Sequence, residues 1–286
     1  PDRECPYQTA GGVLLADSAD SLSKTAEGVT GETFEPSPET SCRFGFRRGS
    51  LPGSGAWTHG YGDLGNTACS GDRTKFGPMD ILWFGRPGTQ FMLERHIKGA
   101  SPLVDEGLLY ATGNDYLAGL DAYNGTILWE NHLAGSGRMA MLKDCGNMTT
   151  ADGLLYVASN SECVVLHGRT GREQTRFPAA PQDSKTHWGY IAAAGDLLVG
   201  STTTPDAELK PGNREDYVTV WKHFKPVVVS TSLFALDRKT GRRVWTWTPP
   251  SGTILNPTIT ILDGKVCFVE STNPATASEA NGKLPL

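Results

Sequence analysis

A nine-residue phrase occurs twice in this chain, as Asp121-Ala-Tyr-Asn-Gly125-Thr-Ile-Leu-Trp129 and as Asp237-Arg-Lys-Thr-Gly241-Arg-Arg-Val-Trp245. In each copy an apolar run leads into the Asp, the Gly ends a tight turn, and the Trp falls on the returning strand. Asn124-Gly125 is a strong hairpin signal, because a type I′ turn needs positive φ at both central residues. A strand–turn–strand unit that repeats with a large aromatic at a fixed offset indicates a repeat architecture.

A second recurring element, a Gly followed by an apolar run, sets the period of the repeat. The intervals between successive copies are 46, 42 and 69 residues, and the third becomes 41 when the polar stretch 203–230 is left out. Repeats of about 40–45 residues with four short strands are typical of β-propeller blades. The copies begin at Gly107, Gly153, Gly195 and Gly264.

The repeats predict an all-β β-propeller with four-stranded blades, part of a larger ring of about seven or eight blades. We expect residues 57–286 to hold the blades and residues 1–56 to form a partial blade or an N-terminal extension. The expected units lie near 95–134, 145–178, 187–248 with an insertion at 203–230, and 255–272, of which the last is incomplete. Because a propeller must close to remove its sheet edges, other protein chains or further blades of the same protein are the expected partners.

The middle unit departs from the repeated phrase at two positions. His167 stands where the other copies have Asp, and Thr175 stands where they have Trp. A large aromatic at the edge of a blade buries apolar area against the next blade. We therefore expect the middle unit to keep its strands and to lose its aromatic contact with the neighbouring unit.

The charge and the cysteines narrow the class of protein. A net charge of −5 and a pI of about 5.7 argue against nucleic acid or an anionic membrane surface as a partner, and no apolar run is long enough to span a membrane. Six cysteines without a CxxC pair exclude a thioredoxin-like site, a zinc ribbon and covalent c-type haem attachment.

An even number of cysteines in a Gly- and Pro-rich β protein favours disulfides, and with them a periplasmic or extracellular location. Cys145 and Cys163 are one candidate pair, although bridging them needs adjustment of a loop. Buried free thiols are the alternative.

The repeats resemble those of the quinoprotein-type (PQQ-like) β-propellers, whose blades carry a pattern similar to Gly-Lys-Val-Tyr-Val-Gly … Ala-Leu-Asp-x-x-Thr-Gly-x-x-x-Trp. Segments 232–245 and 117–129 match this pattern. The stretch from Trp57 through Tyr-Gly-Asp63 and Asn66-Thr to Trp83 is similar to a motif of quinoprotein dehydrogenases and of large secreted planctomycete proteins. The resemblance covers roughly residues 57–272 and implies blades of the tryptophan-docking type.

The same resemblance implies, as one alternative, an oxidoreductase that uses PQQ and Ca²⁺. Two features of quinoprotein alcohol dehydrogenases are missing from the sequence, an adjacent Cys-Cys pair and a matching pattern of Asp residues from several blades. We therefore expect a secreted or periplasmic binding or assembly module of a larger protein or complex, which is not an enzyme by itself. A purely structural scaffold is the third interpretation.

Polar residues precede the first strand of each expected unit, where propeller ligands bind at one mouth of the central channel. The candidate ligand-binding residues are Arg95 as an anion donor, His96 and His187 as titratable imidazoles, Asn147 as an amide and Trp188 as a stacking face. Such a set fits a carboxylated aromatic or a sugar, with either His as a general base. Each residue has a structural alternative, in which it satisfies backbone groups or pairs with a surface carboxylate. A metal site from His59, His96 and His187 is a further alternative.

The inserted segment 205–227 contains Trp221-Lys-His-Phe224 and is polar. Long loops on rigid scaffolds often carry binding function. The segment is therefore interpreted either as a lid or protein-contact loop, or as an excursion without a binding role.

Overall fold

The structure is a computed structural model of the chain, and its strands account for nearly all of the regular structure. Within the described residues the only α-helix is α1 (Ala19–Thr25). Most of the inserted segment, with Trp221 and Phe224, lies outside the described residues. The structure describes residues 13–25, 31–36, 42–73, 81–88, 90–91, 99–138, 143–205, 207, 227–272 and 283–284.

Three four-stranded antiparallel sheets follow one another along the chain, and we call them the first, second and third blades. Their first strands lie innermost, since β4 contacts β8 and β8 contacts β12. The first blade consists of β4 (Leu103–Asp105), β5 (Leu108–Gly113), β6 (Tyr116–Asp121) and β7 (Ile127–His132). The second consists of β8 (Met148–Ala151), β9 (Leu154–Ser159), β10 (Glu162–His167) and β11 (Glu173–Pro178). The third consists of β12 (His187–Ala194), β13 (Leu197–Thr203), β15 (Ser232–Asp237) and β16 (Arg243–Trp247).

The fourth unit is one long antiparallel hairpin. A 3₁₀ turn, η1 (Asn256–Thr258), interrupts its first arm, and the chain reverses between β18 and β19. The insertion after β13 returns as β14 (Val227–Ser230), which pairs with β17 and with β21 (Lys283–Leu284). The hairpin strands are β17 (Thr253–Leu255), β18 (Thr260–Leu262), β19 (Lys265–Cys267) and β20 (Glu270–Ser271).

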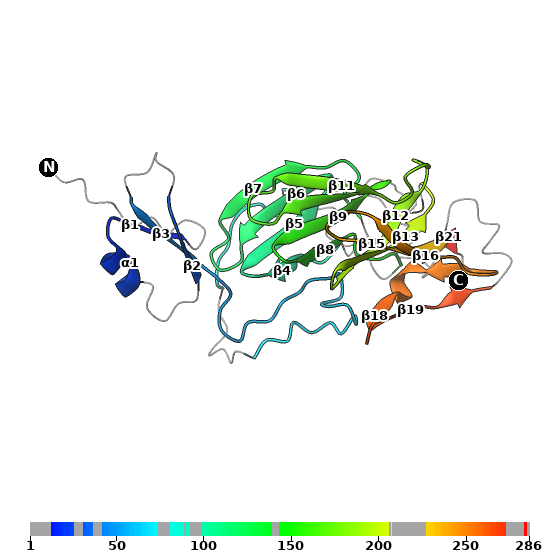
Figure 1. Ribbon diagram of the computed structural model, residues 1–286, viewed down its shortest axis with the longest axis horizontal. Coiled ribbons are helices and arrows are strands. Elements are labelled where there is room, and N and C mark those ends of the chain that lie inside the picture. Colours follow the sequence, from blue (N-terminus) through cyan, green and yellow to red (C-terminus); the bar gives the residue numbers. More distant parts are fainter. Residues whose placement is uncertain are drawn as a thin grey trace.

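A small separate sheet precedes the blades. Its strands β1 (Val13–Ala16), β2 (Gly31–Phe34) and β3 (Phe44–Arg48) pair in the order β1-β3-β2. Figure 1 shows this sheet at one end of the molecule and the orange and red fourth unit at the other, with the three blades between them.

Short Gly turns join the first and second strands of the units. Both central residues have positive φ at Glu106-Gly107, Asp152-Gly153 and Asp263-Gly264, as a type I′ turn requires. This turn matches the right-handed twist of its flanking strands, which explains why an acidic residue followed by a Gly precedes the apolar run in three of the four units.

The turn at Asn124-Gly125 differs from the type I′ turn expected from the sequence. Gly125 has a φ of 71°, but Asn124 is not among the described residues with positive φ. The carboxylate of Asp121 sets the turn instead, because its Oδ1 accepts the backbone N–H groups of Tyr123 (2.9 Å) and Asn124 (3.2 Å).

The other two copies of this turn are built in the same way. Asp237 Oδ1 accepts the N–H groups of Lys239 and Thr240. In the middle unit His167 replaces the carboxylate, and its Nδ1 accepts the N–H of Thr170 at 3.3 Å. The first residue of the repeated phrase is therefore a hydrogen-bond acceptor that holds the turn.

Aromatic side chains at the end of one unit dock onto the Gly turn of the next. The ring of Trp129 lies on Gly171, and its indole N–H donates to the carbonyl of Gly168 at 2.7 Å. Trp83 lies in the same way on Gly125 and donates to the carbonyl of Ala122 at 3.0 Å. The Trp129 contact holds the first and second blades face to face, whereas Trp83 reaches the first blade from the segment that precedes it.

The second blade also has an aromatic contact with its neighbour, so the prediction that it is lost is wrong. Phe177, and not Thr175, lies on Gly241 of the third blade. Successive side chains on a strand point to opposite faces, so residues two apart share a face. An aromatic two positions after the expected one therefore reaches the same neighbour.

Each junction between units encloses its own hydrophobic core. Leu103, Trp129 and Leu155 pack between the first and second blades. Cys163 belongs to the core between the second and third blades, whereas Cys145 packs with Tyr190 and Ile259 between the third blade and the fourth unit. Both thiols are free, so the candidate pairing of these two cysteines is wrong, because they lie in different cores.

Candidate functional site

Segment 57–66 lies against the inner strands of several units. Its first residue, Trp57, exchanges both backbone hydrogen bonds with Val104 of β4 (2.7 and 2.9 Å). The carbonyl of Thr58 accepts the N–H of Thr150 at the end of β8. Figure 1 shows the light-blue segment running along the lower side of the blades toward β18.

The far end of this segment contacts the fourth unit. The carbonyl of Leu64 accepts the N–H of Ile261 in β18 at 2.8 Å, and Asn66 Nδ2 donates to the carbonyl of Ile259 at 2.9 Å. Asp63 holds the loop in shape by accepting the N–H and the hydroxyl of Thr67. The segment that resembles a quinoprotein motif is thus a connector between the first, second and fourth units.

His59 is the buried imidazole of this connector. Its Nδ1 lies 2.7 Å from Thr58 Oγ1 and its Nε2 lies 2.9 Å from Thr149 Oγ1 of β8. Burial lowers the pKa of His59 to about 4, against smaller opposing effects of Asp63 and the Ala193 backbone. The ring is therefore neutral at physiological pH, and both nitrogens contact hydroxyl groups.

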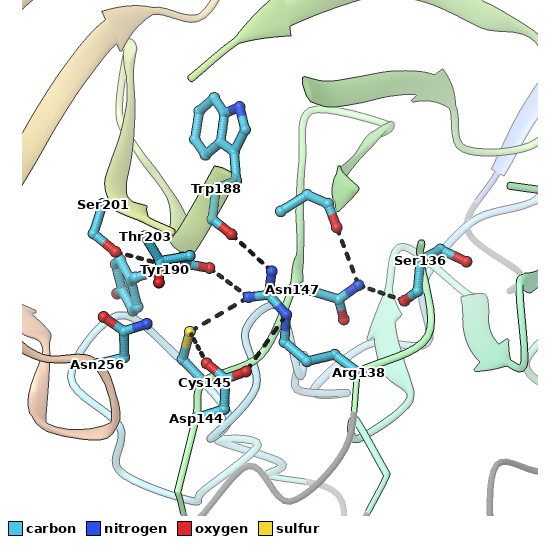
Figure 2. Close-up of polar contacts among 12 residues, drawn as sticks. Ser136, Arg138, Asp144, Cys145, Asn147, Trp188, Tyr190, Ser201, Thr203 and Asn256 are labelled. Atoms are coloured by element: carbon cyan, nitrogen blue, oxygen red, sulfur yellow. Dashed lines mark hydrogen bonds and ion pairs between the residues drawn. The ribbon is translucent and has the colours of Figure 1, made fainter. Parts of the chain in front are cut away.

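A buried guanidinium joins the connection between the first and second blades to β12 of the third blade (Figure 2). Arg138 donates to the carbonyls of Trp188 (2.8 Å) and Gly189, and its Nε lies 3.7 Å from Asp144 Oδ2. The side chains of Arg138 and Asp144 are 4% and 0% exposed. A buried charge needs a counterion and hydrogen-bond partners, and this arrangement supplies both.

The Cys145 thiol lies beside this ion pair, 3.6 Å from Arg138 Nη1 and 3.4 Å from Asp144 Oδ1. Burial is the largest cause of its altered pKa, which is raised well above the usual value, and Asp144 adds to the increase. A thiol that stays protonated is a poor nucleophile and a poor metal ligand. The cluster therefore serves to join blades and does not activate the cysteine.

Two buried amides complete the polar interior. Asn147 Nδ2 donates to the carbonyls of Ser136 (2.6 Å) and Ala158 (3.3 Å). Asn256 Oδ1 accepts from Ser230 Oγ, which lies 2.8 Å from Ser201 Oγ. Asn147 Oδ1 and Asn256 Nδ2 have no protein hydrogen-bond partner among the described residues. A cavity of about 20 Å³ is lined by His59, Cys145, Tyr190 and Asn256, and a space of this size holds one water molecule.

The structure brings together only part of the set of candidate ligand-binding residues. Arg95 and His96 lie outside the described residues. Asn147 is fully buried, and His187 is half-buried at the start of β12. Trp188 is a core side chain, whose indole N–H donates to the carbonyl of Phe177 and whose ring lies edge-on to Phe234. Ligand binding by this set remains a prediction.

Sequence reasoning missed the charged pair of Arg138 and Asp144 and the hydroxyl pair of Ser201 and Ser230. None of the four lies in the repeated phrase or directly before an apolar run. The one signal in the sequence was an Arg and an Asp close to Cys145 along the chain.

The described residues along the axis do not fit PQQ with Ca²⁺. The described part of the chain contains no group of three or more His, Cys, Asp or Glu side chains that could hold a metal ion. The cavity at His59 accommodates a water molecule and not a tricyclic quinone. Two larger hollows lie away from it, one of about 710 Å³ beside Trp57 and Leu109 and one of about 430 Å³ between Arg47 and Arg169.

Successive four-stranded sheets, joined by aromatic side chains on Gly turns, define a β-propeller with blades of the PQQ-like, tryptophan-docking type. Residues 82–199 match the sequence family described as outer membrane protein assembly factor BamB. This match confirms the resemblance to PQQ-like propeller repeats in that part of the chain. No curated protein sequence matches the chain, and among the described helices none is long and apolar enough to cross a membrane.

Three solved structures are similar to the chain at low identity. A europium-containing methanol dehydrogenase is 15% identical with a TM-score of 0.41, over 68% of this chain and 32% of that one. BamB from Moraxella catarrhalis is 16% identical with a TM-score of 0.36, over 59% and 44%. The Neurospora crassa Pan2 WD40 domain is 6% identical with a TM-score of 0.41, over 67% and 49%. The chain thus spans 32–49% of the length of these proteins, and the fold assignment rests on the sheets described above.

Proposed function

We propose that this chain is a binding or assembly module, a series of PQQ-like blades whose two end faces associate with further blades or other protein chains. Residues 57–286 form the propeller part in this proposal, and residues 1–56 form an N-terminal extension. Ligand binding by Arg95, His96, Asn147, His187 and Trp188 is part of the proposal as the sequence predicts it, and the first two of these residues lie outside the described residues.

The observation that carries the proposal is the contrast between inner and outer faces of the blades. Aromatic side chains at the inner junctions are buried, with Trp129 8% and Phe177 5% exposed. Beside Trp83, which lies on the first blade, Phe84 is 95% exposed, and in the fourth unit Leu262 is 62% and Val269 53% exposed. Monomeric soluble proteins rarely expose large contiguous apolar patches, so open end faces of this kind favour association.

A periplasmic or extracellular location is part of the proposal. The family that matches residues 82–199 is described as an outer membrane protein assembly factor. Cys42 is disulfide-bonded, which supports an oxidising compartment. The free Cys69, Cys145, Cys163 and Cys267 give no further support.

The test is site-specific photo-crosslinking in the cells that make the protein. The photoreactive residue p-benzoylphenylalanine is placed at Phe84 or at Leu262, on the two end faces. Gln174, an exposed residue of the outer strand of the second blade, is the control position. We expect crosslinks to protein from both end positions and none from the control. Crosslinks that are equally weak at all three positions would contradict the proposal.

A further inference from the structure

The fourth unit contains the inner half of a blade. In the three complete blades the second strand has a partner on both sides, as β5 lies between β4 and β6, β9 between β8 and β10, and β13 between β12 and β15. In the fourth unit β19 pairs with β18 alone among the described strands. The outer edge of β19 therefore presents N–H and C=O groups that can pair with an added strand.

The third blade ends in a Trp that lies on none of the described Gly turns. Trp245 occupies the same position in the repeated phrase as Trp129. Trp129 finds its turn in the outer hairpin of the next blade, β10–β11, at Gly171. Trp245 instead packs against the same core as Val266 and Phe268 of the inner hairpin.

Apolar side chains around this position are exposed. Trp247 is 40% exposed and its ring lies 5.2 Å from that of Phe268. Val244 is 46% and Val269 53% exposed. If the contacts of Trp83, Trp129 and Phe177 with their Gly turns are repeated once more, the outer hairpin of a fourth blade would lie beside these residues.

We propose that a β-hairpin from another polypeptide segment, with an Asp-x-x-x-Gly turn of the PQQ-like repeat, completes the fourth unit by pairing with β19 and receiving Trp245 on its Gly. This inference rests on the proposed function and names the partner of one end face. The hairpin brings two strands to β19 and covers Trp247 and Val269.

The described part of a second copy of this chain does not provide such a turn. The three described turns of this kind, at Gly125, Gly171 and Gly241, are already covered by Trp83, Trp129 and Phe177. The occupant therefore carries a turn of its own. A Gly is required in it, because a Cβ at Gly171 would lie 2.5 Å from the ring of Trp129.

The test places p-benzoylphenylalanine at Val269 of the full chain in the cells that make it, with Gln174 as the control position. The crosslinked peptide is then identified by mass spectrometry. The proposal expects a peptide with an Asp-x-x-x-Gly hairpin turn. Replacing the Gly of that turn by Val in the partner, which leaves this chain unchanged, is expected to lower the crosslink yield about tenfold.

Three outcomes would overturn the inference while the proposed function stands. The first is a crosslinked peptide without such a turn, and the second is a crosslink to a second copy of this chain. The third is that crosslinks form from Phe84 and none form from Val269. An unchanged yield with the Gly→Val partner also overturns it. Absence of crosslinks from both end faces overturns the proposed function as well.

Discussion

The indole of Trp129 lies so close to Gly171 that a Cβ on this Gly would be 2.5 Å from the ring carbon Cδ2. Gly171 also has a φ of 65°. The Gly thus meets two separate requirements, a left-handed backbone and a close approach of an aromatic ring from the preceding blade. Trp83 on Gly125 and Phe177 on Gly241 repeat this relationship.

Gly171→Ala is expected to destabilise the protein more than Gly153→Ala. Both residues have positive φ, 65° and 70°, so both variants lose roughly 1 kcal/mol to backbone strain. Only Gly171 faces an aromatic ring, because a Cβ on Gly153 would have no neighbour within 4 Å. The additional loss of stability expected at Gly171 is about 1–3 kcal/mol, and urea unfolding of the two variants measures it. Equal losses in the two variants would show that the ring does not require the Gly.

Phe177→Ala is expected to lower the free energy of unfolding by about 3–5 kcal/mol, because the side chain is a buried aromatic at the junction between two blades. Thr175→Ala is the matched control on the same face of β11. Thr175 is exposed, so its loss is expected to change stability by less than about 0.5 kcal/mol. A larger effect at Thr175 than at Phe177 in thermal or urea unfolding would contradict the assignment of the docking residue.

Arg138→Met is expected to cost about 3–5 kcal/mol, because the buried carboxylate of Asp144 loses its guanidinium partner. The double variant Arg138→Met with Asp144→Leu removes both charges. It is expected to be more stable than the sum of the single losses predicts, by about 1–3 kcal/mol. Strict additivity in a double-mutant cycle would mean that the two residues do not interact.

The buried imidazole of His59 is expected to make stability depend on pH. Its pKa is about 4 in the folded protein and 6.5 in the unfolded chain, so the unfolded state binds more protons between these values. Stability therefore rises with pH across this window, by about 3 kcal/mol in total. The contribution is complete above pH 6.5 and is lost as the pH falls toward 4.

Comparison with His59→Gln isolates this contribution. Burial, followed by the charge of Glu106, raises the pKa of Asp105 to about 6. The contribution of Asp105 to stability therefore falls as the pH rises, which is opposite in sign to the contribution of His59. The difference in unfolding free energy between wild type and variant is expected to shrink from pH 7 to pH 4.5. A constant difference would contradict a neutral, buried His59.

The spacing of Asp, Gly and Trp predicted the docking of Trp129, because turn and strand geometry fix where a side chain four residues after the turn points. The same local reasoning failed at Phe177, since strand alternation allows the aromatic to move by two residues without changing faces. It also gave the wrong turn type at Asn124-Gly125, where hydrogen bonds to Asp121 decide the backbone.

Contacts between distant segments could not be predicted from local sequence patterns. Arg138 donates to carbonyls of residues 50 and 51 positions further along the chain. Because every residue has a backbone carbonyl, the residue type does not identify these acceptors. Cys145 and Cys163 are 18 residues apart, yet Cys163 on β10 faces the third blade, whereas Cys145, which precedes β8, packs between the third blade and the fourth unit. Such separations depend on how blades stack, which only the structure gives.

The most direct test of an open series of blades is the hydrogen exchange rate of the Val266 amide, compared with that of Leu155. In a two-residue hairpin the residues that flank the turn bond to each other, so the next amide points toward the strand beyond. Leu155 has such a strand in β10, whereas Val266 has none among the described strands. We predict rapid exchange at Val266 and strong protection at Leu155 in the purified chain. Equal protection at both amides would contradict an open fourth unit.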